Sequence, residues 1–112
     1  MSEPINSNDP LCLLLTNENV AGFNAARAKG QEANLRGCNF RGLDLRGLNA
    51  DGLDLRDAYF RNCNLRGIDF RRALLEGASL ADAQISGCYF PKNILADEIV
   101  MSVLQGTRLR AQ

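Results

Sequence analysis

Apolar residues recur with a period of five over more than half of this chain. Divided into blocks of five from Ala33, residues 33–92 give twelve blocks in which the first and third places are always apolar. An α-helix would advance each block by about 500° and scatter these places around its axis. A long strand would send successive third places to opposite faces, because five is an odd number. The chain must therefore turn a corner in every block.

Turn-forming residues stand where these corners are needed. Gly, Asp or Asn fills most fifth places, and these residue types accept the backbone angles of tight turns. Four corners close a coil of twenty residues, and the next coil would stack on it at about 4.8 Å, the spacing of paired strands. Side chains twenty residues apart would then be vertical neighbours.

The blocks resemble the pentapeptide-repeat family, whose loose consensus is A(D/N)LXX. Blocks such as ANLRG from Ala33 and CNLRG from Cys63 carry this pattern. The resemblance covers residues 33–92 and implies an all-β solenoid, a right-handed quadrilateral β-helix of about three coils. It also implies that the third residue of each block points inward. The predicted structural core then consists of Leu35, Phe40, Leu45, Leu55, Phe60, Leu65, Phe70, Leu75, Leu80, Ile85 and Phe90.

The flanking segments predict α-helices that cap the two ends of the stack, where the apolar interior and unpaired backbone would otherwise be exposed. Asp9 before Pro10 favours a short helix that runs to about Thr16. Asn19 is a good N-cap for a second helix that runs to about Lys29. We therefore expect one compact domain, with an N-terminal arm and capping helices at 1–32, the β-helix at 33–92, and a C-terminal capping helix and tail at 93–112.

The C-terminal capping helix is predicted from about Ala96 to Gln105, with Gly106 as its stop signal. An apolar stripe on this helix is expected to cover the third coil, and it consists of Ile99, Val100, Val103 and Leu104. Met101 lies off this stripe. It is either a solitary exposed side chain or part of a second apolar edge through which two chains would form a homodimer.

The residue inventory argues against catalysis and metal binding. The chain has no His, so the commonest general base and metal ligand is missing. Stacking would place Asp44 beside Asn64 and Asp54 beside Leu74, so no carboxylate pair forms for acid–base chemistry. We expect no enzyme activity, no catalytic or metal site and no cofactor. No apolar run is long enough to span a bilayer, so we expect no membrane association and a cytoplasmic location.

Cys38, Cys63 and Cys88 follow one another at intervals of 25 residues. A spacing of twenty would stack them on one face, whereas this spacing moves each to the next face and the next coil. We expect them inside the stack as small hydrophobic side chains, out of disulfide reach of one another. Cys12 falls in an apolar run and is expected in the core as well. Reduced thiols fit the reducing cytoplasm.

Arginine dominates the fourth places of the first two coils. Two stacked arginines repel each other by about 1 kcal/mol in a water-like dielectric. An aspartate two residues earlier offers relief in three blocks, which gives the pairs Asp44–Arg46, Asp54–Arg56 and Asp69–Arg71. One face has no such acid, and we call it the ladder face: Asn39, Arg41, Tyr59 and Arg61.

Arg and Tyr are typical anchors of protein interfaces, so we predict that the ladder face binds an acidic surface of a protein partner. The candidate partner-binding residues are Arg41, Arg61 and Tyr59, followed by Arg36, Arg46, Arg56, Arg66 and Arg71. In the alternative, arginine is only a soluble filler of these places.

Three functions stay open on the sequence. The first is a non-enzymatic scaffold or adaptor that docks a protein through a rigid wall lined with arginine. The second is polyanion or nucleic-acid binding along the arginine columns, which a balance of 13 basic and 13 acidic residues disfavours. The third, a DNA mimic that modulates DNA gyrase, is implied by some members of the family. It needs a long acidic rod, which a short stack with two basic coils does not provide.

Overall fold

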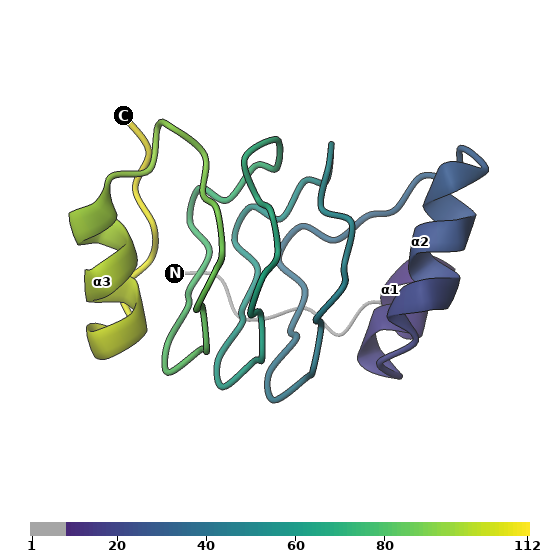
Figure 1. The fold of residues 1–112 in the computed structure, drawn as a ribbon, viewed down its shortest axis with the longest axis horizontal. Helices are drawn as coiled ribbons and strands as arrows, with labels where there is room; N and C mark the ends of the chain where they lie inside the picture. The colour runs from purple at the N-terminus through teal and green to yellow at the C-terminus, as the bar shows by residue number, and fades with distance from the viewer. Residues whose placement is uncertain (1–8) are drawn as a thin grey trace.

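The computed structural model describes residues 9–112, which contain three helices: α1 (Pro10–Thr16), α2 (Val20–Ala28) and α3 (Ala96–Gln105). These bounds coincide with the spans expected from the sequence. Figure 1 shows α1 and α2 at one end of a series of stacked loops and α3 at the other end. The repeat region therefore lies between helices that are far apart in the sequence.

The residues that favour helix ends stand at these ends. The Asp9 side chain accepts hydrogen bonds from two backbone N–H groups in the first turn of α1, and the Asn19 side chain accepts one from Gly22 at the start of α2. Helix α3 begins after Leu95, which provides no side-chain cap, and ends at Gly106 with a left-handed φ of 72°.

Parallel β-bridges join residues twenty apart, the register expected from the period of five. They connect the first coil (33–52) to the second (53–72) and the second to the third (73–92): Asn39–Tyr59, Asp44–Asn64, Asp54–Leu74, Tyr59–Ser79, Asn64–Gln84 and Asp69–Tyr89. Stacked rings follow the same register, with centroids 5.4 Å apart for Phe40 and Phe60. Within residues 9–112 the pairing consists of isolated bridges and not of extended strands.

Nine of the eleven residues predicted for the core are fully buried. The exceptions are Ile85 and Phe90, which pack against the core but stay partly exposed. Both belong to the last coil, where no fourth coil covers them.

The predicted contact face of α3 is wrong in part. Val100 and Leu104 were expected against the third coil, yet 55% and 69% of their surfaces are exposed. Helix α3 instead buries Ser102 completely, with Ile99 and Val103 partly buried beside it. The Ser102 Oγ accepts a hydrogen bond of 2.8 Å from the backbone N–H of Leu80, so the helix meets the coil through a polar contact.

The first coil lacks a preceding coil to accept its backbone N–H groups, and side chains replace it. In the second coil, second-place N–H groups donate to the first coil, as Tyr59 does to the Cys38 carbonyl at 2.9 Å. In the first coil, the N–H of Asp44 donates to the Glu18 carboxylate at 2.6 Å, and the N–H of Asn49 donates to the Asn24 side chain at 2.9 Å. These side-chain oxygens take the place of the carbonyl groups that a preceding coil would offer.

The last coil obtains acceptors from α3 and from the segment that follows it. The N–H of Asp82 donates to the Val103 carbonyl at 2.9 Å, and the N–H of Gly77 donates to the Leu109 carbonyl at 2.7 Å. The C-terminal segment also forms an antiparallel bridge between Ser79 and Arg108, and Leu109 is buried. The segment after α3, which the sequence predicts only as a tail, therefore packs along the third coil.

Candidate partner-binding surface

Three arginines of the predicted surface are held by aspartates in their own blocks. In each pair the Asp carboxylate accepts the backbone N–H of the arginine, which stabilises the corner, and then binds the guanidinium through two further hydrogen bonds. The shortest N–O distance is 2.7 Å in each of Asp44–Arg46, Asp54–Arg56 and Asp69–Arg71. The three pairs expected from the sequence are thus present.

These contacts favour the ionised carboxylates. The hydrogen bond from the Arg46 guanidinium lowers the pKa of Asp44, and the Arg56 guanidinium lowers the pKa of Asp54 in the same way. The effect is largest at Asp69, where the Arg71 guanidinium lowers the pKa to about 2. Each pair is therefore a neutral unit over the physiological pH range.

Three other arginines of the predicted surface have no such neighbour. Arg41 and Arg66 follow an asparagine two residues earlier, and the asparagine accepts their backbone N–H but brings no negative charge. Arg61 has Tyr59 two residues earlier, which brings no negative charge either. All three side chains are exposed, and within residues 9–112 no ion pair involves them. The uncompensated positive charge of the wall is concentrated on these residues.

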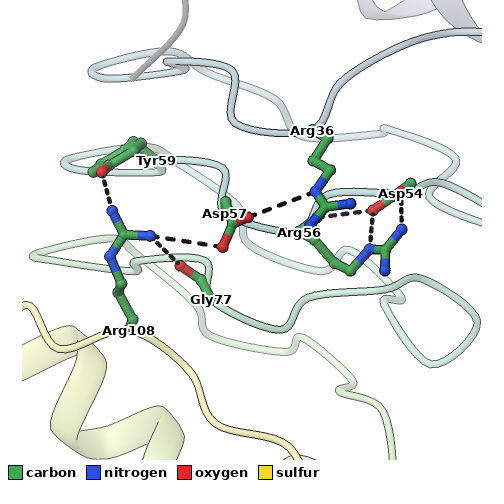
Figure 2. Close-up of polar contacts among 7 residues, drawn as sticks. All are labelled: Arg36, Asp54, Arg56, Asp57, Tyr59, Gly77 and Arg108. Atoms are coloured by element: carbon green, nitrogen blue, oxygen red, sulfur yellow. Dashed lines mark hydrogen bonds and ion pairs between the residues drawn. The ribbon is translucent and has the colours of Figure 1, made fainter. Parts of the chain in front are cut away.

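Asp57 joins the first coil to the C-terminal segment. Its carboxylate lies 3.6 Å from the Arg36 guanidinium on one side and 3.6 Å from the Arg108 guanidinium on the other (Figure 2). Arg36 is therefore engaged in an ion pair, although no acid in its own block offered one. Asp57 itself stands at a corner with a left-handed φ of 62°.

The C-terminal segment covers Tyr59 on the ladder face. The Arg108 guanidinium donates hydrogen bonds to the Tyr59 hydroxyl and to the Gly77 carbonyl (Figure 2). It also lies 5.1 Å from the centre of the Tyr59 ring, within cation–π range. Tyr59 is thus half-buried and already occupied by this chain, so the exposed part of the ladder face consists of Arg41 and Arg61.

Neither Asp57 nor Arg108 is among the residues predicted from the sequence. A signal for Asp57 was present, since an acid at a fifth place lies next to the arginine corners of the neighbouring coils. The place of Arg108 could not be read from the period, because residues 93–112 lie outside the repeat and have no register.

A second basic surface lies on another face of the stack. Arg71, Arg72 and Lys92 line a shallow hollow of about 710 Å³ together with Leu74 and Pro91. The Arg71 guanidinium is fixed there, 4.6 Å from the centre of the Tyr89 ring.

Among residues 9–112 there is no group of three or more His, Cys, Asp or Glu side chains that could hold a metal ion, and no helix has the length and apolar character of a membrane span.

The repeat register, the corners and the block pattern agree with a comparison against protein families. The model for pentapeptide repeats matches residues 19–52 and 54–90, with eight copies. The chain belongs to the pentapeptide-repeat family. The match begins at the N-cap of α2, Asn19, and thus earlier than residues 33–92, which carry the resemblance in the sequence. No curated protein and no solved structure matches the chain.

Members of the pentapeptide-repeat family are in general structural repeat proteins that form β-helical solenoids and act as protein-interaction scaffolds without catalysis. A solenoid leaves its outer wall available for binding. The specific function of a member depends on the side chains that its wall presents, because one fold carries many functions.

Proposed function

We propose that this pentapeptide-repeat chain is a non-enzymatic scaffold or adaptor that binds an acidic surface of a protein partner. We further propose that its wall is a right-handed quadrilateral β-helix of about three coils, capped by α1 and α2 at one end and by α3 at the other. Hydrogen bonds between coils, such as that from the Gly42 N–H to the Arg61 carbonyl at 2.8 Å, order this wall before any partner arrives. A preordered surface loses little conformational entropy on docking, which supports a binding role.

One observation carries the proposal: Arg41 and Arg61 are stacked, exposed and uncompensated. The bridge between Asn39 and Tyr59 sets these two blocks side by side, so the arginines two residues later are neighbours. Their positive charges repel each other, and a partner carboxylate placed between them would remove that repulsion. Arg66, which is 25 residues after Arg41, lies on the next face and is not part of the ladder face. The ion-paired arginines Arg46, Arg56 and Arg71 contribute less to the attraction of an acidic partner, because an aspartate already neutralises each of them.

Charge reversal on the ladder face tests the proposal. The wild-type chain and the double variant Arg41→Glu/Arg61→Glu are compared in affinity capture from native lysate, and captured proteins are identified by mass spectrometry. The matched control is Arg72→Glu/Lys92→Glu, which makes the same change in net charge on another exposed surface. We expect an acidic partner to be lost with the first variant and kept with the second. Equal capture by all three chains would refute the ladder face.

A milder variant tests the same surface without reversing a charge. Asn39→Asp would create a fourth Asp-x-Arg pair and neutralise Arg41, with the corner hydrogen bond retained. We expect a purified partner to bind several-fold more weakly to this variant, with unchanged thermal stability. Asn49→Asp is the control, because Asp51 rather than an arginine stands two residues later.

Binding of nucleic acid along the arginine columns is the second candidate, and the uncompensated Arg41, Arg61 and Arg66 are what supports it. The four ion-paired arginines oppose it, since they have less charge to offer phosphate groups. A labelled oligonucleotide titrated at two salt concentrations separates the candidates. Binding that weakens steeply with salt would favour nucleic acid. Absence of binding at low salt would exclude it.

A further inference from the structure

Two cysteines from different elements face each other at the N-terminal end of the stack. The Sγ of Cys12 in α1 lies 3.4 Å from the Sγ of Cys38 in the first coil. Both side chains are buried, each with 1% of its surface exposed. No disulfide links the cysteines in this structure. The sulfur atoms would have to approach by roughly 1.4 Å to reach the bonding distance of about 2.05 Å.

The other two cysteines have different surroundings. The Cys63 thiol donates a hydrogen bond to the Phe40 carbonyl at 2.7 Å, and the Cys88 thiol donates to the Leu65 carbonyl at 2.9 Å. Burial raises the pKa of Cys63 to about 11 and also raises the pKa of Cys88. Both are therefore held as thiols against backbone oxygens of the preceding coil. The Cys38 thiol also lies 3.7 Å from a backbone oxygen, the Asn34 carbonyl of its own turn, but it differs from Cys63 and Cys88 in having the Cys12 thiol within hydrogen-bond distance.

We propose that Cys12 and Cys38 are a redox modification site: they form a reversible disulfide that fastens α1 to the first coil. The oxidant is a low-molecular-weight disulfide of the glutathione class. One cysteine thiolate attacks a sulfur of this disulfide, which gives a mixed disulfide and releases the first small thiol. The second cysteine thiolate then displaces the second small thiol. Two electrons and two protons leave the cysteines, and the oxidant is reduced to two thiols.

The buried position of the pair determines how the exchange proceeds. Oxidant reaches the sulfurs when α1, a helix of seven residues, lifts from the first coil. Once formed, the bond closes a loop between residues 26 apart in sequence and restricts the unfolded chain. We expect the melting temperature to rise by on the order of 10 °C. In a reducing cytoplasm the site is open, and oxidant exposure closes it. This site is independent of the ladder face and of any partner.

The test uses the full chain in buffers of varied ratio of reduced to oxidised glutathione. After acid quenching and alkylation in denaturant, mass spectrometry measures the intact mass and the linked peptides. We expect a mass lower by about 2 Da and a peptide that links residue 12 to residue 38. The double variant Cys63→Ala/Cys88→Ala should retain this link and show the rise in melting temperature on oxidation. The single variants Cys12→Ala and Cys38→Ala should each lose both.

Two results would overturn the proposal. In the first, glutathione adds to the half-buried Cys88 alone, while Cys12 and Cys38 of the wild-type chain are both alkylated after denaturation. In the second, the oxidised wild-type chain yields linked peptides that join other cysteines. Both results come from the wild-type chain, so they do not depend on whether an alanine variant folds.

Discussion

At the scale of single residues, the second place of each block determines what the arginine of that block can do. Asp and Asn both accept the arginine N–H at the corner, as Asp44 does for Arg46 at 3.2 Å and Asn39 does for Arg41 at 3.1 Å. Only Asp also holds the guanidinium. One oxygen-for-nitrogen difference therefore separates a neutral corner from a corner that presents a positive charge.

The pH dependence of stability follows from these pairs. The folded-state pKa of Asp44, Asp54 and Asp69 lies below the unfolded value of about 3.9, so ionisation stabilises the folded chain at higher pH. This contribution is complete above about pH 5 and is lost as pH falls through the folded values, to about 2 for Asp69. Urea unfolding at several pH values should show constant stability from pH 7 to 5 and a decline between about pH 4 and 2.

The control for this decline is the triple variant Asp44→Asn/Asp54→Asn/Asp69→Asn. It keeps the corner hydrogen bonds and removes the titrating groups, so its stability should fall less at low pH. Glu98, whose pKa is lowered by the Arg110 guanidinium, still contributes a smaller decline in both chains. An equally steep decline in the variant would mean that other carboxyl groups cause it.

Gly77 is required by the close approach of Asp57. A Cβ atom at Gly77 would lie 2.0 Å from the Asp57 Oδ1, and the backbone φ is +79°. We expect Gly77→Ala to lower the free energy of unfolding by about 2–3 kcal/mol, from left-handed strain of about 1–2 kcal/mol plus displacement of the Asp57 carboxylate from its ion pairs. Gly47→Ala is the matched control, with φ +85° and no atom within 4 Å, and should show the strain alone. Denaturant unfolding compares them, and equal losses would contradict the role of Asp57.

At the scale of elements, the repeat and the helix spans could be predicted because each follows from a local signal. The period of five places corners and stacked neighbours, and capping residues such as Asn19 and Gly106 mark helix ends. The contact face of α3 could not be predicted in this way. A stripe of large apolar residues is expected to pack inward, but the last coil also requires acceptors for its N–H groups. Ser102 and the Val103 carbonyl meet that need, which turns Val100 and Leu104 outward.

The contact between Ser102 and Leu80 can be tested by a small substitution. Ser102→Ala removes the hydroxyl and leaves the buried N–H of Leu80 without its acceptor. We expect the free energy of unfolding to fall by about 1–3 kcal/mol, and amide hydrogen exchange at Leu80 to accelerate. Ser86→Ala is the control, because it makes the same substitution at an exposed serine of the third coil. Unchanged exchange at Leu80 in Ser102→Ala would show that α3 is docked by its apolar contacts alone.

At the scale of the whole molecule, the two ends of the stack differ in character. The N-terminal end is closed by α1 and α2 with charged and amide acceptors such as Glu18 and Asn24, and the first two coils carry the arginines. The C-terminal end is more apolar. Beside the half-buried Ile85 and Phe90, helix α3 exposes Val100 and Leu104. This distribution supports the proposal of an acidic partner on the arginine-lined wall, and it leaves α3 as the surface where a second copy of the chain would bind.

The sequence leaves open a homodimer through a second apolar edge of α3 at Met101, which is 36% exposed, and this alternative can be tested at the same end of the stack. Two copies that meet through α3 would bury Val100 and Leu104, which are 55% and 69% exposed in the single chain. We expect sedimentation velocity to show a concentration-dependent dimer for the wild type and a monomer for Val100→Glu/Leu104→Glu. Because both side chains point away from the third coil, the variant should unfold at nearly the same denaturant concentration. A wild-type chain that stays monomeric up to about millimolar concentration, where a contact worth only about 4 kcal/mol would show, would contradict a dimer at this end.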